Sequence, residues 1–256
     1  MAAAHGYEGI VNLLIEKKAN TESKDNEHNQ TSLIWAVKGN HTTVTKLLLK
    51  NGANPETEDK YGQTPLLLAA ALGHEMIVNL LIERGANIES KDYRKKTPLL
   101  WAARGNHEMA TKLLLENGAS LEAEDCDGMT PLILAAGYGD EMIVNLLLEK
   151  GADIESRDTS SYGWTSLLWA AAMNNITTAK LLLDKGANLE ARSVSGTTSL
   201  SVAATNGHEM MVKLLLDAGA NPYSLDGFGQ SPLSKALQNG HETVANHLRE
   251  RIALFY

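Results

Sequence analysis

The sequence predicts an all-α solenoid, a stack of similar helix-turn-helix units joined by hairpin-like loops. The main observation is a repeated Thr/Ser-Pro/Ser-Leu segment whose leucines recur through the chain as Leu33, Leu66, Leu99, Leu132, Leu167, Leu200 and Leu233. Five of the six intervals are 33 residues long, and the remaining interval is 35. Units of this length cannot bury their apolar faces alone, so the constant period predicts stacking between neighbours.

The first helix of each unit starts at the repeated segment. In the second full unit, Thr64 supplies an oxygen that can cap the helix, and Pro65 stands at the first helical position, where its missing N–H costs nothing. The helix is expected over residues 65–72, because Gly73 and His74 then interrupt it.

The second helix is expected over residues 75–83. Ile77, Leu80 and Leu81 recur there at helical spacing, and Gly85 follows as a left-handed cap. An exposed turn then leads to the next unit. Because helices of eight to ten residues are marginal in isolation, their stability has to come from stacking.

The repeats predict one continuous array over residues 1–256. The expected boundaries are 1–24 for an N-terminal partial repeat, 25–58, 59–91, 92–124, 125–157, 158–192 and 193–225 for inner repeats, and 226–256 for a C-terminal capping repeat. Ser234 and Lys235 replace apolar residues in the last unit, which predicts a polar end. The first residues supply only half a unit, with Lys18 in place of the closing glycine, so we expect a longer array of which this is the C-terminal part.

The chain resembles ankyrin repeats over essentially its whole length. The matching segments are DKYGQTPLLLAA (residues 59–70), GHEMIVNLLIERGAN (residues 73–87) and their counterparts in every unit. The resemblance implies seven full repeats after a half repeat, with L-shaped units in a curved array. It also implies binding on the concave face and the loop tips, and no catalysis. Where the family favours histidine after the Thr-Pro-Leu segment, this chain has apolar residues such as Leu67.

Composition excludes several classes of protein. The chain is 43% hydrophobic, which is normal for a folded protein, and its longest apolar run, residues 66–72, is far shorter than the roughly 18 residues of a membrane span. A single cysteine, Cys126, excludes an internal disulfide, and no secretory leader opens the chain, so we expect an intracellular, cytoplasmic setting. The net charge of −8 argues against a nucleic-acid partner, because phosphate binding favours a basic face.

Residues with catalytic or metal-binding chemistry recur at fixed repeat positions and do not converge on one place. One position is occupied by His41, His74, His107, His208 and His241, with Asp140 and Asn175 as substitutes, which indicates a loop and helix-capping role. Another is occupied by Glu22, Glu56, Glu89, Glu122, Glu155 and Glu190, which indicates a solvated rim. Enzymes need unique, convergent groups, so we expect no catalytic residue, no metal site and no cofactor.

Function is expected where the units differ from one another, at the turn tips and near the ends of the first helices. The candidate partner-binding residues are Tyr61, Tyr93, Arg94, Lys96, Arg104, Met129, Tyr138, Tyr162, Trp164 and Met173. Tyr, Trp, Met and Arg are enriched in protein interfaces. The sequence therefore predicts binding of a protein or peptide, with an acidic segment suited to the basic tip, and no membrane, nucleic-acid or small-molecule ligand.

Alternative interpretations stay open. Trp35, Trp101 and Trp169 share one helical position and are expected to pack between units, whereas Trp164 fits a partner contact and local packing equally. The basic turn at residues 93–96 is either a solvated turn or a recognition site. For the whole chain, an elastic or structural spacer within a larger protein is the main alternative to partner binding, ahead of nucleic-acid binding or catalysis.

Overall fold

The computed structural model describes residues 1–160 and 162–253, and its contacts divide the chain into two units, Met1–Cys126 and Asp127–Tyr256. Residues 254–256 of the expected capping repeat lie outside the described residues. Within the described ranges the regular structure is helical, apart from one isolated bridge between Arg157 and Thr165. The predicted all-α class is confirmed, while the predicted repeat boundaries remain a prediction.

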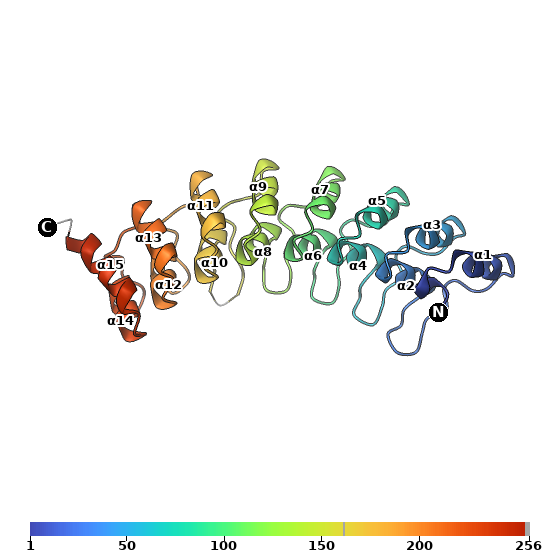
Figure 1. Ribbon diagram of the computed structural model, residues 1–256, viewed down its shortest axis with the longest axis horizontal. Coiled ribbons are helices and arrows are strands. Elements are labelled where there is room, and N and C mark those ends of the chain that lie inside the picture. The colour runs from blue at the N-terminus through green and yellow to red at the C-terminus, as the bar shows by residue number, and fades with distance from the viewer. Residues whose placement is uncertain (161, 254–256) are drawn as a thin grey trace. The chain divides into compact units, whose positions relative to one another are not determined.

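The first unit contains a short 3-10 helix, η1, and seven α-helices (Figure 1). Their bounds are Ala3–His5 for η1, Glu8–Glu16 for α1, Ser32–Lys38 for α2, Thr42–Lys50 for α3, Pro65–Ala71 for α4, Glu75–Glu83 for α5, Pro98–Arg104 for α6 and Glu108–Glu116 for α7. The first helices of successive repeats pack side by side in the order α2, α4, α6, and the second helices pack in the order α1, α3, α5, α7.

The second unit repeats the same arrangement with eight helices in its described part. Their bounds are Pro131–Tyr138 for α8, Glu141–Glu149 for α9, Ser166–Ala172 for α10, Ile176–Asp184 for α11, Ser199–Thr205 for α12, Glu209–Asp217 for α13, Pro232–Gln238 for α14 and Glu242–Ala253 for α15. First helices pack in the order α8, α10, α12, α14, and second helices in the order α9, α11, α13, α15.

The expected capping and closing residues define the helix ends. The hydroxyl of Thr64 accepts a hydrogen bond from the Leu67 N–H at 3.3 Å, and Pro65 is the first residue of α4. Gly85 follows α5 with a positive φ of 78°, as the left-handed cap requires. Lys18, which stands at the equivalent position after α1, takes the same left-handed conformation with φ 59°, although it carries a side chain.

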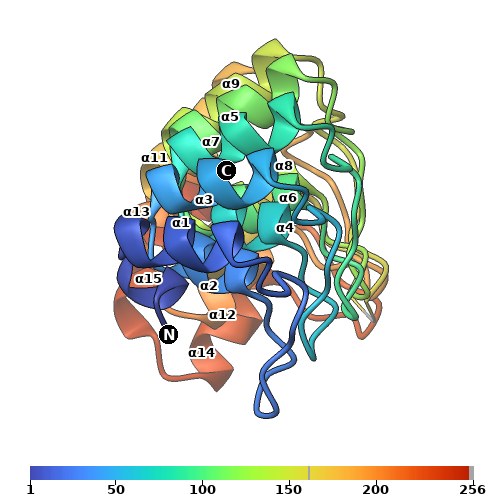
Figure 2. The same cartoon turned by 90° about the vertical axis from the view of Figure 1, so that its right-hand side faces the viewer.

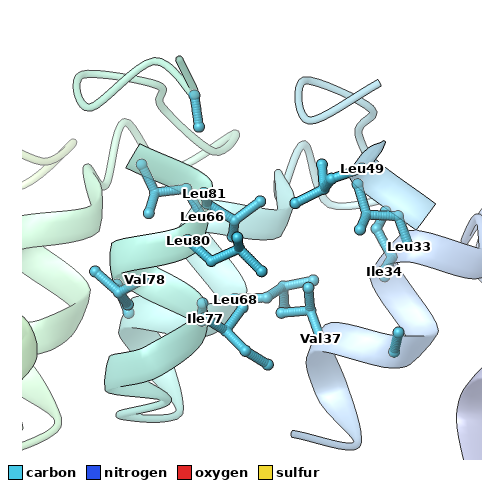
Figure 3. Close-up of a cluster of buried hydrophobic side chains, with 14 of the residues drawn as sticks. Leu33, Ile34, Val37, Leu49, Leu66, Leu68, Ile77, Val78, Leu80 and Leu81 are labelled. Carbon is cyan, nitrogen blue, oxygen red and sulfur yellow. The ribbon is translucent and has the colours of Figure 1, made fainter. Parts of the chain in front are cut away.

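The core of the first unit lies between the two rows of helices. Figure 3 shows Leu66 and Leu68 of α4 beside Leu80 and Ile77 of α5, with Val37 of α2 pointing towards them. All of these side chains are buried. Burial of each one contributes roughly 1.5–3 kcal/mol, which explains how such short helices persist.

One apolar face of the first unit is exposed. Ile10 and Leu14 of α1 are 51% and 46% exposed, whereas Ile77 and Leu81, which occupy the same repeat positions in α5, are both 0% exposed. The packing agrees with this difference, because α5 packs against α3, α4 and α7, whereas α1 packs mainly against α3.

The hairpin loops ahead of the first helices are tied to one another at their tips. In the first unit the Lys60 N–H donates to the His28 carbonyl, the Tyr93 N–H to the Tyr61 carbonyl, and the Cys126 N–H to the Arg94 carbonyl, at 3.0–3.2 Å. The loops before α2 and α4 extend on the same side of the helices (Figure 2). Backbone hydrogen bonds of this kind fix the position of each tip relative to the next one.

None of the helices in the described ranges combines the length and the apolar character that crossing a membrane requires.

Candidate partner-binding surfaces

The tips of the first unit present two exposed tyrosines. Tyr61 is 53% exposed and Tyr93 is 73% exposed. The Lys60 ammonium lies 5.2 Å from the Tyr61 ring centroid. The Tyr93 ring lies against Gly62, where a Cβ atom would approach the ring to 2.6 Å, and Gly62 has a φ of 75°. Glycine at this position therefore permits both the turn and the close approach of the ring.

The ends of the first helices in the first unit pair a cation with an indole. Lys38, the last residue of α2, places its ammonium 5.2 Å from the Trp35 ring centroid. Arg104, the last residue of α6, places its guanidinium 5.3 Å from the Trp101 ring. Leu72, which directly follows α4 between these helices, is 44% exposed. We call Lys38, Leu72 and Arg104 the helix-end strip.

Each of these indoles is also anchored to the loop of its own repeat. Trp35 Nε1 donates to Asp25 at 3.1 Å, and Trp101 Nε1 donates to Asp92 at 2.9 Å. The backbone N–H of His28 lowers the pKa of Asp25, and the Trp35 hydrogen bond adds to this effect against the opposing effect of burial. The tryptophans are half-buried, so the expected packing role is accompanied by a polar anchoring role that the repeat pattern alone does not indicate.

Lys96 corrects the predicted site. Its side chain is buried, with only 6% of the residue exposed, and its ammonium is paired with the buried carboxylate of Asp125. Trp101 covers the same ammonium at 5.9 Å. Lys96 therefore stabilises the loop and is not available to a partner, whereas Arg94 and Lys95 of the same turn are exposed.

The second unit has an aromatic cluster in and beside the enlarged turn. The ring centroids of Tyr162 and Trp164 lie 5.1 Å apart in the enlarged turn. Trp164 also contacts Trp169 of α10 edge-on, with 5.1 Å between the ring centroids. Trp169 Nε1 donates to Asp158 at 2.7 Å, as its counterparts do in the first unit. Tyr162 is 57% exposed and Trp164 is half-buried, so Trp164 packs locally and still reaches the surface.

The last residues of the first helices in the second unit carry no charge. Tyr138, the last residue of α8, is 58% exposed, and Met173, which follows α10, is 51% exposed. Met129 in the preceding loop is only half-buried. The predicted residues of this unit thus present aromatic and thioether groups, without a cation at the ends of the first helices.

The recurring histidines connect consecutive repeats. His41 and His107 in the first unit, and His208 in the second, place Nε2 3.0 Å from the carbonyls of Ala4, Ala71 and Ala172, which belong to the preceding repeats. None of these three caps its own helix, so the capping prediction is wrong for them. The prediction holds for Asp140, whose carboxylate accepts from the Ile143 N–H.

His74 occupies the same repeat position. Burial lowers the pKa of His74, the facing Lys38 backbone carbonyl opposes that effect, and His107 adds to it.

The recurring glutamates also connect repeats. Glu56 and Glu122 are exposed, and the others, Glu22, Glu89, Glu155 and Glu190, are half-buried. In the first unit the carboxylate of Glu56 accepts from the Asn87 N–H at 2.8 Å, and in the second unit Glu190 accepts from the Asn221 N–H at 2.8 Å. Glu22, Glu89 and Glu155 make equivalent contacts. These acids are therefore part of the scaffold. Among the residues that the structure describes, no cluster of three or more His, Cys, Asp or Glu is arranged to hold a metal ion.

Comparison with known families decides what this repeated arrangement is. The family model described as ankyrin repeats in three copies matches residues 1–92, 91–158 and 169–253, and a second ankyrin repeat model matches residues 134–183. The chain belongs to the ankyrin repeat family. Ankyrin repeats are general protein-protein interaction modules, and their fold is an interaction scaffold without catalytic chemistry of its own.

A solved ankyrin repeat structure has the same fold. The crystal structure of the ankyrin repeat domain of Bcl-3, described as a unique member of the IkappaB protein family, matches with a TM-score of 0.75 and 29% sequence identity. The match covers 87% of this chain and 100% of that domain. Among curated proteins, no match was found.

Two exposed residues of the ankyrin surface stand outside the predicted set. Lys38 and Leu72 lie at the ends of first helices, like Arg104, Tyr138 and Met173, which the prediction included. The signal that identifies them was present in the sequence, because all five stand at the same place in their repeats or one residue away. The structure adds the ring contact that holds the Lys38 ammonium in place.

Proposed function

We propose that this ankyrin repeat chain is a non-catalytic binding module that recognises a partner protein or peptide through its loop tips and the ends of its first helices. The single observation that supports this proposal best is the exposure of large side chains on the tips and at the ends of the first helices. Tyr61, Tyr93, Tyr138, Tyr162 and Met173 are each more than half exposed. Large aromatic and thioether groups at such positions have no core to fill and are typical of interface anchors.

The scaffold beneath these side chains supports recognition with little ordering cost. Backbone hydrogen bonds join neighbouring tips, and Trp-Asp contacts hold the loops that contain Asp25, Asp92 and Asp158 against their helices. A surface that is already ordered loses little conformational entropy on binding, so more of the contact energy becomes affinity. Arg94, Lys95 and Arg104 add positive charge for steering an acidic partner.

Selection from a random peptide display library tests the proposal. We expect clones that bind the intact chain and lose most of their binding to the Tyr93→Ala/Tyr138→Ala/Trp164→Ala variant. Removing three such anchors is expected to weaken binding by several kcal/mol, whereas the helical circular dichroism signal should persist.

The matched control removes three exposed methionines from second helices, as Met76→Ala/Met142→Ala/Met210→Ala. These side chains are 71%, 61% and 61% exposed, so the loss of exposed apolar surface is comparable. Some clones could bind the tyrosine-tryptophan variant as well as they bind the parent, and fail to bind the methionine variant. That result would place the binding site on the second helices. Failure to enrich any clone would favour the spacer role.

A further inference from the structure

We infer that the helix-end strip of the first unit recognises an extended peptide in which an acidic residue, an apolar residue and a second acidic residue are each separated by about three positions. The inference rests on the proposed function and deepens it, because it names the chemistry of the partner and one of the surfaces that would bind it.

The two outer positions of the strip are cations held in place by rings. Lys38 and Arg104 are exposed, and each lies over the indole of a tryptophan whose own N–H is bonded to a loop aspartate. The ring restrains the cation and also offers an apolar surface beside it. A carboxylate side chain suits this combination, because its oxygens meet the cation and its methylene groups meet the indole.

The nearby aspartates do not take the place of such a carboxylate. Asp25 accepts hydrogen bonds from Trp35 and from the backbone N–H groups of Glu27, His28 and Gln30. Asp92 is buried and accepts from Trp101 and from backbone N–H groups of its own turn. Both carboxylates are therefore committed to their own loops, and the Lys38 ammonium lies 3.4 Å from the neutral side-chain oxygen of Gln30.

The central position of the strip is apolar. Leu72 is 44% exposed, and Leu68 one turn before it is buried at 7% exposure, in the position that Trp35 and Trp101 occupy in the flanking repeats. An apolar side chain of the partner covers Leu72 without leaving a buried charge or an unsatisfied polar group. Across α2, α4 and α6 the order is therefore cation, apolar, cation.

The repeat spacing converts this order into a peptide pattern. Packed helices lie about 8–10 Å apart, so one repeat step is about 10 Å and the two cations are about 20 Å apart. An extended chain advances about 3.3 Å per residue, so one step corresponds to about three residues. The expected pattern is acid-x-x-apolar-x-x-acid, in a peptide that crosses the three first helices.

The test begins with the peptides selected from the random library against the intact chain. We expect enriched sequences to share two acidic residues about six positions apart with an apolar residue midway. A labelled peptide with glutamates at positions 1 and 7 and leucine at position 4, in a serine background, serves as the defined probe. Its binding is measured by fluorescence anisotropy against the full chain.

Charge reversal then assigns each contact. Lys38→Glu and Arg104→Glu are each expected to weaken binding of the probe by about tenfold, which corresponds to the loss of about one hydrogen bond to a charged group. Lys38→Glu is expected to be rescued by a probe with lysine at one of its two acidic positions, and Arg104→Glu by lysine at the other. Lys112→Glu, an exposed lysine on α7, changes the net charge equally and should have little effect.

The outcomes separate this inference from the broader function. Enriched peptides without the acidic pattern, or probes that bind both reversed variants as well as the parent, would overturn the inference while leaving the binding function intact. Equal weakening by Lys112→Glu would also overturn it, because the effect would then reflect net charge alone. Failure to enrich any peptide would contradict both proposals.

Discussion

The two units of the chain share one scaffold and differ in the side chains at their first-helix ends. In the first unit these ends carry Lys38 and Arg104 over indoles, whereas in the second they carry Tyr138 and Met173. The hydrogen bond beneath these helix ends is the same in both units: Trp101 Nε1 donates to Asp92 at 2.9 Å, and Trp169 Nε1 donates to Asp158 at 2.7 Å. The polar contacts beneath are thus shared by the repeats, whereas the exposed first-helix position differs between them, and the proposed function assigns recognition to that position.

The same comparison explains the different partners of the loop aspartates. Asp25, Asp92 and Asp158 are followed nine to eleven residues later by a tryptophan that donates to them. Asp125 has Leu134 at that distance, and Lys96 of the preceding loop supplies the charge instead. In the last repeat the helix position itself carries a lysine, Lys235, whose ammonium lies 2.8 Å from Asp226.

The largest expected effect follows from breaking the buried pair of the first unit. Lys96→Ala leaves the buried Asp125 carboxylate without its cation, and loss of one member of such a pair costs about 3–5 kcal/mol. We expect a reduction of that size in the free energy of unfolding, measured by urea denaturation. Lys95→Ala, in the same turn but exposed, should change it by less than about 0.5 kcal/mol.

A double variant sharpens this result. Lys96→Met/Asp125→Leu removes both charges, and replacement of a buried pair by apolar groups is often neutral. We therefore expect it to recover most of the stability that Lys96→Ala loses. If Lys96→Ala unfolds at the same urea concentration as the parent chain, Lys96 is not a stabilising buried residue. It would then be a candidate partner-binding residue again.

The next largest effect on the free energy of unfolding should be of similar size in the two units. Trp101→Phe and Trp169→Phe keep an aromatic ring but remove the N–H that binds Asp92 or Asp158. A hydrogen bond to a charged group contributes about 1.5–3 kcal/mol, so each variant should lose a similar free energy of unfolding. A loss confined to one unit would show that the shared anchor is not equivalent in both.

The smallest effect concerns pH in the first unit. Burial lowers the pKa of His74, so the unfolded chain binds a proton more readily than the folded chain. The contribution of neutral His74 is therefore fully present above the unfolded value near 6.5 and is lost as the pH falls below it. His74→Asn should reduce the loss of stability between pH 7 and pH 5, measured by thermal unfolding, whereas an unchanged pH dependence would contradict this assignment.

In the second unit, stability should depend on pH at lower values, through the carboxyl group of Asp226. Burial opposes ionisation of Asp226, but the hydrogen bonds from Lys235 and from the backbone N–H groups of Gln230 and Phe228 prevail and lower the pKa of its carboxyl group. Its contribution to the free energy of unfolding is fully present above the unfolded pKa near 3.8 and is lost as the pH falls below that value and through the lowered pKa of the folded chain. Asp226→Asn should reduce the loss of stability on acidification below pH 4, measured by thermal unfolding, and Asp217→Asn, at the exposed last residue of α13, should not.

The sequence predicted the fold because the repeat pattern records local rules. Thr64, Pro65 and Gly85 act through their own backbone neighbours, so the positions of the helix ends follow from residues a few places away. Lys96 was misassigned because its burial depends on Asp125 in the next repeat, and a turn position considered alone gives no sign of it. The histidine contacts were missed for the same reason, since their carbonyl partners lie 36–37 residues earlier.

The most direct test of the central claim measures binding and stability in parallel for one exposed and one buried change in the first unit. Lys38→Ala/Arg104→Ala should lose binding of the selected peptides and keep the parent free energy of unfolding to within about 1 kcal/mol, since exposed positions contribute little to stability. Lys96→Met/Asp125→Leu should keep that binding. If the buried variant loses the peptides while the exposed variant retains them, the division between scaffold and recognition surface is contradicted.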